Sequence, residues 1–212
     1  MKQLSFVLMY LISPVIPSIF FFTSMGGSVD GYTLSGIFGV YAFILLCNQL
    51  ILASRPKFAV KALGIKGLLA LHSIAPMFIL SLAIAHRMLK GEYGFDLGST
   101  QATIGVIVLF VLFFASIAAF LLMANVQPPL GTKLRALRAW VEKTFKVGYK
   151  TSRAFHGITL LALVTLAVHV SLASSASLSS NLFGMAWLGA WLLVSLAIFI
   201  RYRVRGRLTP KA

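Results

Sequence analysis

Residues 67–89 read GLLALHSIAPMFILSLAIAHRML, and the only formally charged side chain in this stretch is that of Arg87. About 20 apolar residues in a helix cross the hydrocarbon core of a bilayer, which is about 30 Å thick. Unpaired backbone amides are not tolerated in lipid and no period-two strand pattern occurs, so we expect helices. Five further stretches are long and apolar enough to span: 4–25, 32–53, 102–124, 151–172 and 182–200. The sequence predicts an all-α polytopic membrane protein, a six-helix transmembrane bundle.

The composition excludes a soluble domain. The 212 residues are 59% hydrophobic and 11% charged, with a mean hydropathy of +0.93, whereas about a quarter of a soluble domain is charged. The single cysteine, Cys47, excludes an internal disulfide and a cysteine-based zinc or iron–sulfur site. The first stretch, which follows Lys2, is longer than a signal-peptide core and no Ala-x-Ala site follows it. We expect it to remain as a helix, bent at Pro14 and Pro17.

The basic residues indicate which side faces the cytoplasm. The formal net charge is +15, and 17 of the 19 Lys and Arg residues lie at the N-terminus or in segments 54–66, 125–153 and 201–212, all on one side. Only Arg87 and Lys90 lie on the other side. The positive-inside rule therefore places both termini in the cytoplasm. The basic balance reflects topology and anionic lipid, so the expected partner is the lipid bilayer, with no nucleic acid.

A polar segment over residues 130–147 carries an amphipathic pattern. Apolar residues recur at helical spacing, and the cations fall largely elsewhere around the helix; the apolar positions are Leu130, Leu134, Leu137, Val141 and Phe145. This pattern predicts a helix that lies on the cytoplasmic surface of the membrane. Two roles remain open for it, a lipid-facing anchor and a docking face for a cytosolic partner.

All four histidines fall within predicted spans, where ionisable side chains are costly and are functional by default. His72 and His86 lie on the third span, and His156 and His169 on the fifth. At 1.5 Å per residue the partners on one helix are about 20 Å apart, one in each leaflet. Both helices run outward, so His72 is level with His156, and His86 with His169. Paired imidazoles suit the axial positions of haem iron, whereas structural zinc needs four converging ligands.

The spacing on the fifth span raises a geometric problem. Fourteen steps of about 100° bring His86 to the same face as His72, but thirteen steps leave His169 about 140° from His156 on an ideal helix. We therefore expect the fifth span to be locally tightened, or to cross the third at an angle.

The motifs LHSIAPMFILSLAIAH (71–86) and FHGITLLALVTLAVH (155–169) resemble the ferric reductase-like transmembrane domain. NADPH oxidases, ferric reductases and small bacterial haem-binding membrane subunits share that domain, and the resemblance covers essentially all of residues 1–212 as a single domain. It implies two b-type haems, the inner held by His72 and His156 and the outer by His86 and His169. It also implies electron transport outward across the membrane, as the membrane subunit of an oxidoreductase.

The resemblance also bears on partners. NADPH oxidases continue into a cytosolic dehydrogenase domain for flavin and NADPH, and this sequence stops at Ala212. It is therefore similar to the standalone bacterial subunits, which implies a bacterial inner-membrane location. The expected donor is a separate cytosolic flavoprotein reductase or a quinol, so flavin or NAD(P)H enters only through a partner. The expected acceptor is an extracytoplasmic redox partner or small molecule.

Three cations are candidates for pairing with haem propionates. Arg153 lies one turn before His156, and Lys66 lies nearly two turns before His72. For these two, ordinary snorkelling to the interface is an equal alternative. Arg87 adjoins His86 on the side that has few cations, where it could also attract an anionic acceptor.

Two other functions remain open at the level of sequence. A quinol-linked bc-type cytochrome b also carries histidine pairs about 13 residues apart, although six spans and the third and fifth placement disfavour it. A histidine-lined metal or proton transporter without haem is the alternative from another class. The separation of the pairs and the lack of a membrane-embedded Asp or Glu disfavour that reading.

Overall fold

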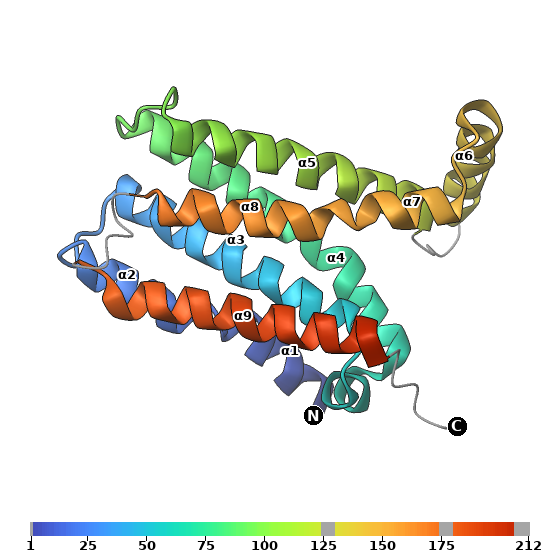
Figure 1. The fold of residues 1–212 in the computed structure, drawn as a ribbon, viewed down its shortest axis with the longest axis horizontal. Coiled ribbons are helices and arrows are strands. Elements are labelled where there is room, and N and C mark those ends of the chain that lie inside the picture. The colour runs from blue at the N-terminus through green and yellow to red at the C-terminus, as the bar shows by residue number, and fades with distance from the viewer. Residues whose placement is uncertain (1, 124–129, 174–179, 206–212) are drawn as a thin grey trace.

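The computed structural model describes residues 2–123, 130–173 and 180–205, and its regular elements there are all α-helices (Figure 1). In chain order they are α1 (Lys2–Ile12), α2 (Val15–Ser24), α3 (Gly31–Ala53), α4 (Lys57–Glu92), α5 (Thr100–Met123), α6 (Leu130–Phe145), α7 (Tyr149–His156), α8 (Ile158–Ser171) and α9 (Leu182–Arg205). Six segments are long and apolar enough to cross a membrane: Lys2–Ser24, α3, α4, Thr100–Leu122, Thr151–Ser171 and α9. The predicted all-α bundle of six spans is confirmed. Residue 124, the predicted end of the fourth span, lies outside the described residues.

The first span is broken where the prolines predict a bend. α1 ends at Ile12 and α2 begins at Val15, with Pro14 between them. Pro17 lies in the first turn of α2, where a missing backbone N–H costs no helical hydrogen bond. The break presents a polar group to the interior, because the Ser13 hydroxyl accepts a hydrogen bond from Asn48 Nδ2 at 2.9 Å.

α4 contains two local departures from a regular helix. Gly64 has φ of +66°, so the segment before it turns away from the remainder, and the predicted span at 67–89 begins just after this break. Pro76 lies inside the span and has no N–H, which leaves the carbonyl of His72 without its donor four residues on. The helix that carries His72 and His86 is thus weakened between the two histidines.

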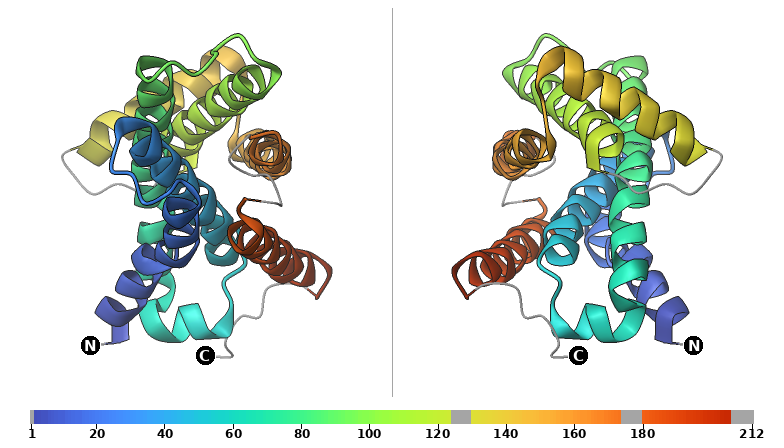
Figure 2. Two further views of the ribbon diagram at one scale, coloured as in Figure 1. Left: turned by 90° about the vertical axis from the view of Figure 1, so that its left-hand side faces the viewer. Right: turned by 90° about the vertical axis from the view of Figure 1, so that its right-hand side faces the viewer.

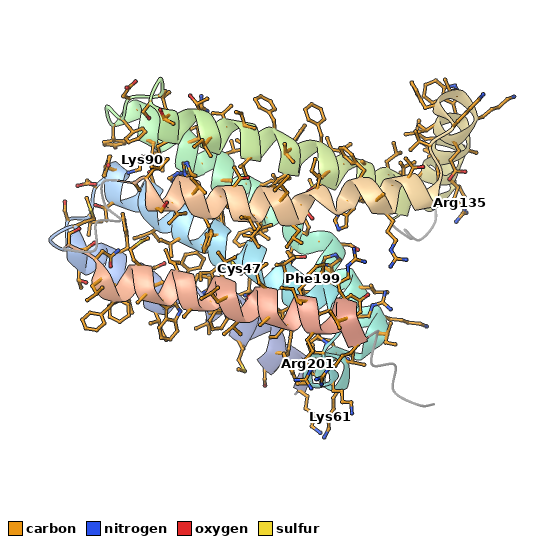
Figure 3. The ribbon with its side chains drawn as sticks, in the orientation of Figure 1. Cys47, Lys61, Lys90, Arg135, Phe199 and Arg201 are labelled. Atoms are coloured by element: carbon orange, nitrogen blue, oxygen red, sulfur yellow. The ribbon has the colours of Figure 1, made fainter. Side chains whose placement is uncertain are left out.

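The two ends of the bundle differ in charge. α1 begins and α9 ends at the same end, and Figure 3 shows Lys61, Arg135 and Arg201 there, with Lys90 at the opposite end. We refer to these as the basic end and the outer end, the basic end being cytoplasmic by the positive-inside rule.

α6 lies across the basic end, nearly at right angles to the spans (Figures 1 and 2). Arg138 Nε donates a hydrogen bond to the carbonyl of Leu121 at 3.1 Å, which fastens α6 to the end of α5. Leu134 is buried, whereas Leu137, Trp140 and Phe145 are exposed. The amphipathic helix predicted over 130–147 therefore forms over Leu130–Phe145, and its orientation is that of a helix in the membrane plane.

The packing leaves one seam in the bundle. α3 packs along α4 and against α9, and α5 packs against both α7 and α8. α4 makes few direct contacts with α7 or α8, and α5 bridges them. Leu80 of α4, Val108 of α5 and Ala162 of α8 belong to one buried cluster beside this seam. The four histidines lie on the helices that border the seam.

Candidate functional site

The structure brings the histidines together as two pairs across the seam. The ring of His72 on α4 lies 6.1 Å from that of His156 at the end of α7, measured between centroids, with an angle of 83° between the planes. The ring of His86 on α4 lies 6.3 Å from that of His169 on α8, at 90°. We call these the inner pair and the outer pair. They are the same pairs that the sequence spacing predicts to be level.

The spacing of each pair fits two ligands of one metal ion. A metal–imidazole nitrogen bond is about 2.0–2.1 Å long. A five-membered ring with bonds of about 1.35 Å has its atoms about 1.15 Å from its centroid. Two imidazoles bound to opposite sides of one ion therefore place their centroids about 6.4 Å apart. Both observed separations, 6.1 and 6.3 Å, lie within a few tenths of an ångström of that distance.

Each imidazole of the outer pair is held by a backbone carbonyl of a neighbouring helix. Nδ1 of His86 lies 2.8 Å from the carbonyl oxygen of Ser35 on α3, and Nδ1 of His169 lies 2.8 Å from that of Gln101 on α5. A carbonyl only accepts, so each Nδ1 carries the proton and donates it. Nε2 of each ring is then unprotonated in the neutral imidazole, with a lone pair available for a metal.

The inner pair is held differently. Nδ1 of His72 and Nδ1 of His156 are both buried and have no hydrogen-bond partner in the described part of the chain. A polar atom buried without a partner is costly, and such atoms mark sites that a further group completes. No hydrogen bond from the described residues therefore fixes the tautomer of the inner imidazoles, in contrast to the outer ones.

A tightened turn sets the position of His156. The α7 helix ends there, Gly157 N donates to the carbonyl of Ala154 at 3.0 Å, and Leu160 N donates to that of Gly157 at 3.2 Å. These bonds span three residues, and such turns rotate the chain by about 120° per residue instead of about 100°. The extra rotation reduces the mismatch of about 140° between His156 and His169 expected for an ideal helix. The structure shows local tightening at this turn, and Figure 1 shows α4 running obliquely to α7 and α8, so both expected solutions are present.

A cavity opens beside the outer pair. The space inside it is about 160 Å³, which is smaller than the roughly 300–1,000 Å³ of pockets for drug-sized ligands. Its interior is apolar, with Phe43, Leu80, Val108 and Leu188 among the lining residues. Polar and cationic groups stand at the outer end: Tyr32, Arg87, Lys90, Gln101 and Asn181. The cavity is therefore amphiphilic, apolar inside with polar and cationic groups at one edge.

The two cations of this cavity have different surroundings. Lys90 Nζ lies 3.0 Å from the centroid of the Tyr32 ring and 5.8 Å from that of Phe95, so aromatic faces hold the ammonium group. Arg87 is half-buried, lines the cavity and has no ion-pair partner among the described residues. Of these two, Arg87 is the cation available to a bound anion.

The predicted inner cations lie on the helices that carry the inner pair, and their pairing with propionates stays a prediction. Lys66 and Arg153 are both exposed, and neither makes a described contact with His72 or His156. Arg55, which has φ of +49°, lies in the connection between α3 and α4.

The described residues contain no group of three or more His, Cys, Asp or Glu side chains able to hold a metal ion. Haem iron needs only one or two protein side chains as ligands, so a pair of histidines suits it. No protein-family model, curated protein or solved structure matches the chain.

Proposed function

We propose that this protein is the membrane part of an oxidoreductase, a b-type cytochrome that conducts electrons from the cytoplasmic to the outer side of the membrane. In this proposal His72 and His156 hold one haem and His86 and His169 hold a second. When bound, each haem supplies one-electron redox chemistry.

One observation carries the proposal: the ring separations of 6.1 and 6.3 Å at two levels of the same seam. A single pair at this distance could be a packing contact. Two pairs with nearly equal separations, each joining α4 to the span formed by α7 and α8 at positions about 20 Å apart, support two sites along one path through the bilayer.

The chain's own residues supply ligation, orientation and charge. The carbonyls of Ser35 and Gln101 orient the outer imidazoles with Nε2 directed away from the backbone acceptor. The apolar lining of the outer cavity excludes water, and Arg87 offers a guanidinium for a carboxylate at the outer edge.

The resemblance to the ferric reductase-like transmembrane domain supports the same assignment and extends it to partners. We propose a separate cytosolic flavoprotein or a quinol as the donor, and a small molecule or redox protein as the acceptor outside. A location in a bacterial inner membrane fits that resemblance. The two histidine pairs leave the choice of donor and acceptor to experiment.

The test is a reduced-minus-oxidised visible spectrum of the purified protein, with a pyridine haemochrome assay for stoichiometry. The expected result is two b-type haems per chain, falling to one in His72→Ala and to one in His169→Ala. Phe78→Leu is the matched control, because Phe78 lies between the two histidines on α4, is exposed to lipid and is expected to leave both haems in place.

A colourless protein that remains colourless after addition of haem would refute the proposal and favour the metal or proton transporter. If two haems are present, the donor is identified by reduction in vesicles with a flavoprotein reductase and NAD(P)H, or with a quinol analogue. Reduction only by quinol, blocked by quinone-site inhibitors, would assign the protein to the quinol-linked alternative.

A further inference from the structure

The outer histidines rest on two copies of one local arrangement. On α3, the carbonyl of Ser35 accepts from His86, and Gly39 follows four residues later. On α5, the carbonyl of Gln101 accepts from His169, and Gly105 follows four residues later. Residues four apart lie one above the other on a helix face, so each carbonyl and its glycine form one surface. We call each surface a platform.

The glycines are the positions where the imidazoles touch the platforms. A Cβ atom added to Gly39 would lie 3.1 Å from both Cε1 and Nδ1 of His86. A Cβ added to Gly105 would lie 2.7 Å from Cε1 and 2.9 Å from Nδ1 of His169. The first distance requires a small movement, whereas the second is closer than real Cβ contacts allow. In both cases the atoms displaced are those that make the hydrogen bond to the carbonyl.

We propose that Gly39 and Gly105 are positioning residues for the outer pair, because a side chain at either position displaces the imidazole from its carbonyl. This proposal rests on the proposed function, since it concerns how the outer ligands are held. Both glycines also line the outer cavity, and in this account each acts through the histidine that it contacts.

The inner pair provides an internal comparison. The Nδ1 atoms of His72 and His156 lack a carbonyl partner in the described ranges, and so no platform fixes them. Hydrogen bonding to a backbone carbonyl raises the basicity of a histidine ligand. The outer site therefore has strongly donating ligands in fixed positions, and loss of a platform should change this site alone.

The experiment reads each site separately by removing the other. In His72→Ala the remaining haem is the outer one, and in His169→Ala it is the inner one. Gly105→Ala and Gly39→Ala are introduced into the His72→Ala protein. Gly189→Ala is the control on another span, because nothing lies within 4 Å of a Cβ added there. The readouts are haem content, midpoint potential from a redox titration, and the electron paramagnetic resonance spectrum.

Gly105→Ala is expected to lower haem content or, where haem is retained, to raise the midpoint potential, because a less basic ligand stabilises ferric iron less. Gly39→Ala is expected to retain haem and to show a smaller shift in the same direction, in line with its longer distance. When Gly105→Ala is introduced into the His169→Ala protein, haem content and midpoint potential are expected to stay unchanged. This comparison separates an effect on positioning from general misfolding.

Unchanged haem content and potential in both glycine variants of the His72→Ala protein would overturn the platform proposal. An equal loss at the inner site would also overturn it. Absence of haem from the parent protein would instead refute the proposed function, so the two failures are distinguishable.

Discussion

Replacing Asn48 by leucine removes two hydrogen bonds that join three spans inside the bundle. Asn48 on α3 donates from Nδ2 to the hydroxyl of Ser13 at the α1–α2 break, and its Oδ1 accepts from Trp191 Nε1 on α9, both at 2.9 Å. Asn48 is 5% exposed, so water does not replace these bonds. Leucine has a similar size, and the change therefore tests the polar contacts more than the packing.

The magnitude follows from measured hydrogen bonds between membrane helices, which average about 0.6 kcal/mol and reach about 1.7 kcal/mol. Loss of both bonds is expected to reduce the free energy of unfolding by about 1–3 kcal/mol. A double-mutant cycle of Asn48→Leu with Trp191→Phe isolates one bond, with an expected coupling of about 0.6–1.7 kcal/mol. The assay is reversible unfolding in mixed micelles, followed by circular dichroism.

Trp187→Phe is the matched control. Trp187 lies one turn before Trp191 on α9, stacks on it at 6.4 Å, and its Nε1 has no hydrogen-bond partner in the described residues. A coupling below about 0.3 kcal/mol between Asn48 and Trp191, or one equal to that with Trp187, would refute the reasoning. Haem content should stay constant, because Asn48 lies about 180° around α3 from Gly39, nine residues away.

Three further predictions follow from particular residues. The ring planes of the two histidine pairs are nearly perpendicular, at 83° and 90°. The electron paramagnetic resonance spectrum of the ferric protein is therefore expected to show strongly anisotropic low-spin signals with one large g value. Signals typical of parallel ring planes would contradict this prediction. Trp140, which is 56% exposed on α6, is expected to face lipid. The part of the tryptophan fluorescence that is lost in Trp140→Phe should therefore be quenched by brominated lipids. Quenching of that part by water-soluble quenchers alone would favour a docking face for a cytosolic protein. Asp30 accepts a hydrogen bond from the backbone N–H of Thr33 and one from the Ser28 hydroxyl, and these bonds hold the pKa of its carboxyl below the usual range. The stabilisation of α3 by this cap is therefore complete above the ordinary carboxyl pKa and is lost as pH falls through the lowered pKa. Asp30→Asn caps the helix without titrating, so its thermal unfolding should depend less on pH between about pH 6 and about pH 3 than that of the parent protein. An equal pH dependence in the two proteins would contradict this prediction.

The membrane spans and the end of the bundle at which the cations gather could be predicted, because both depend on properties that can be read directly from the sequence. The length of an apolar run decides whether it crosses the bilayer, as for α3 and α5, and the positions of the cations decide the sides. The levels of the histidines follow from the rise per residue alone, and the structure places His72 near His156 and His86 near His169.

The contacts that orient the imidazoles could not be predicted in the same way. The acceptors at Ser35 and Gln101 are backbone carbonyls, which every residue has, so no residue type marks them. Gly39 and Gly105 lie on helices whose rotation about their own axes is set by packing. Their spacing of four from the carbonyl residues becomes informative only after the neighbouring helix is placed.

The positions of the cations at the basic end could not be predicted, because the sequence does not reveal the conformation of the connection between α3 and α4. Lys66 and Arg153 were chosen for nearness along the chain, and both are exposed. Arg55, in the connection between α3 and α4, is itself in the left-handed region with φ of +49°. Pro76 was visible in the sequence, and its effect on the carbonyl of His72 could have been anticipated from its spacing of four.

The seam between α4 and α7–α8 gives the bundle an order of assembly. Consecutive spans α3 and α4 pack together, and so do α5 and the α7–α8 span, so each set can form as it leaves the ribosome. Each histidine pair takes one member from each set. A ligand held by a histidine pair then links the two sets of helices after each has formed. By mass action it should raise the free energy of unfolding of the whole protein.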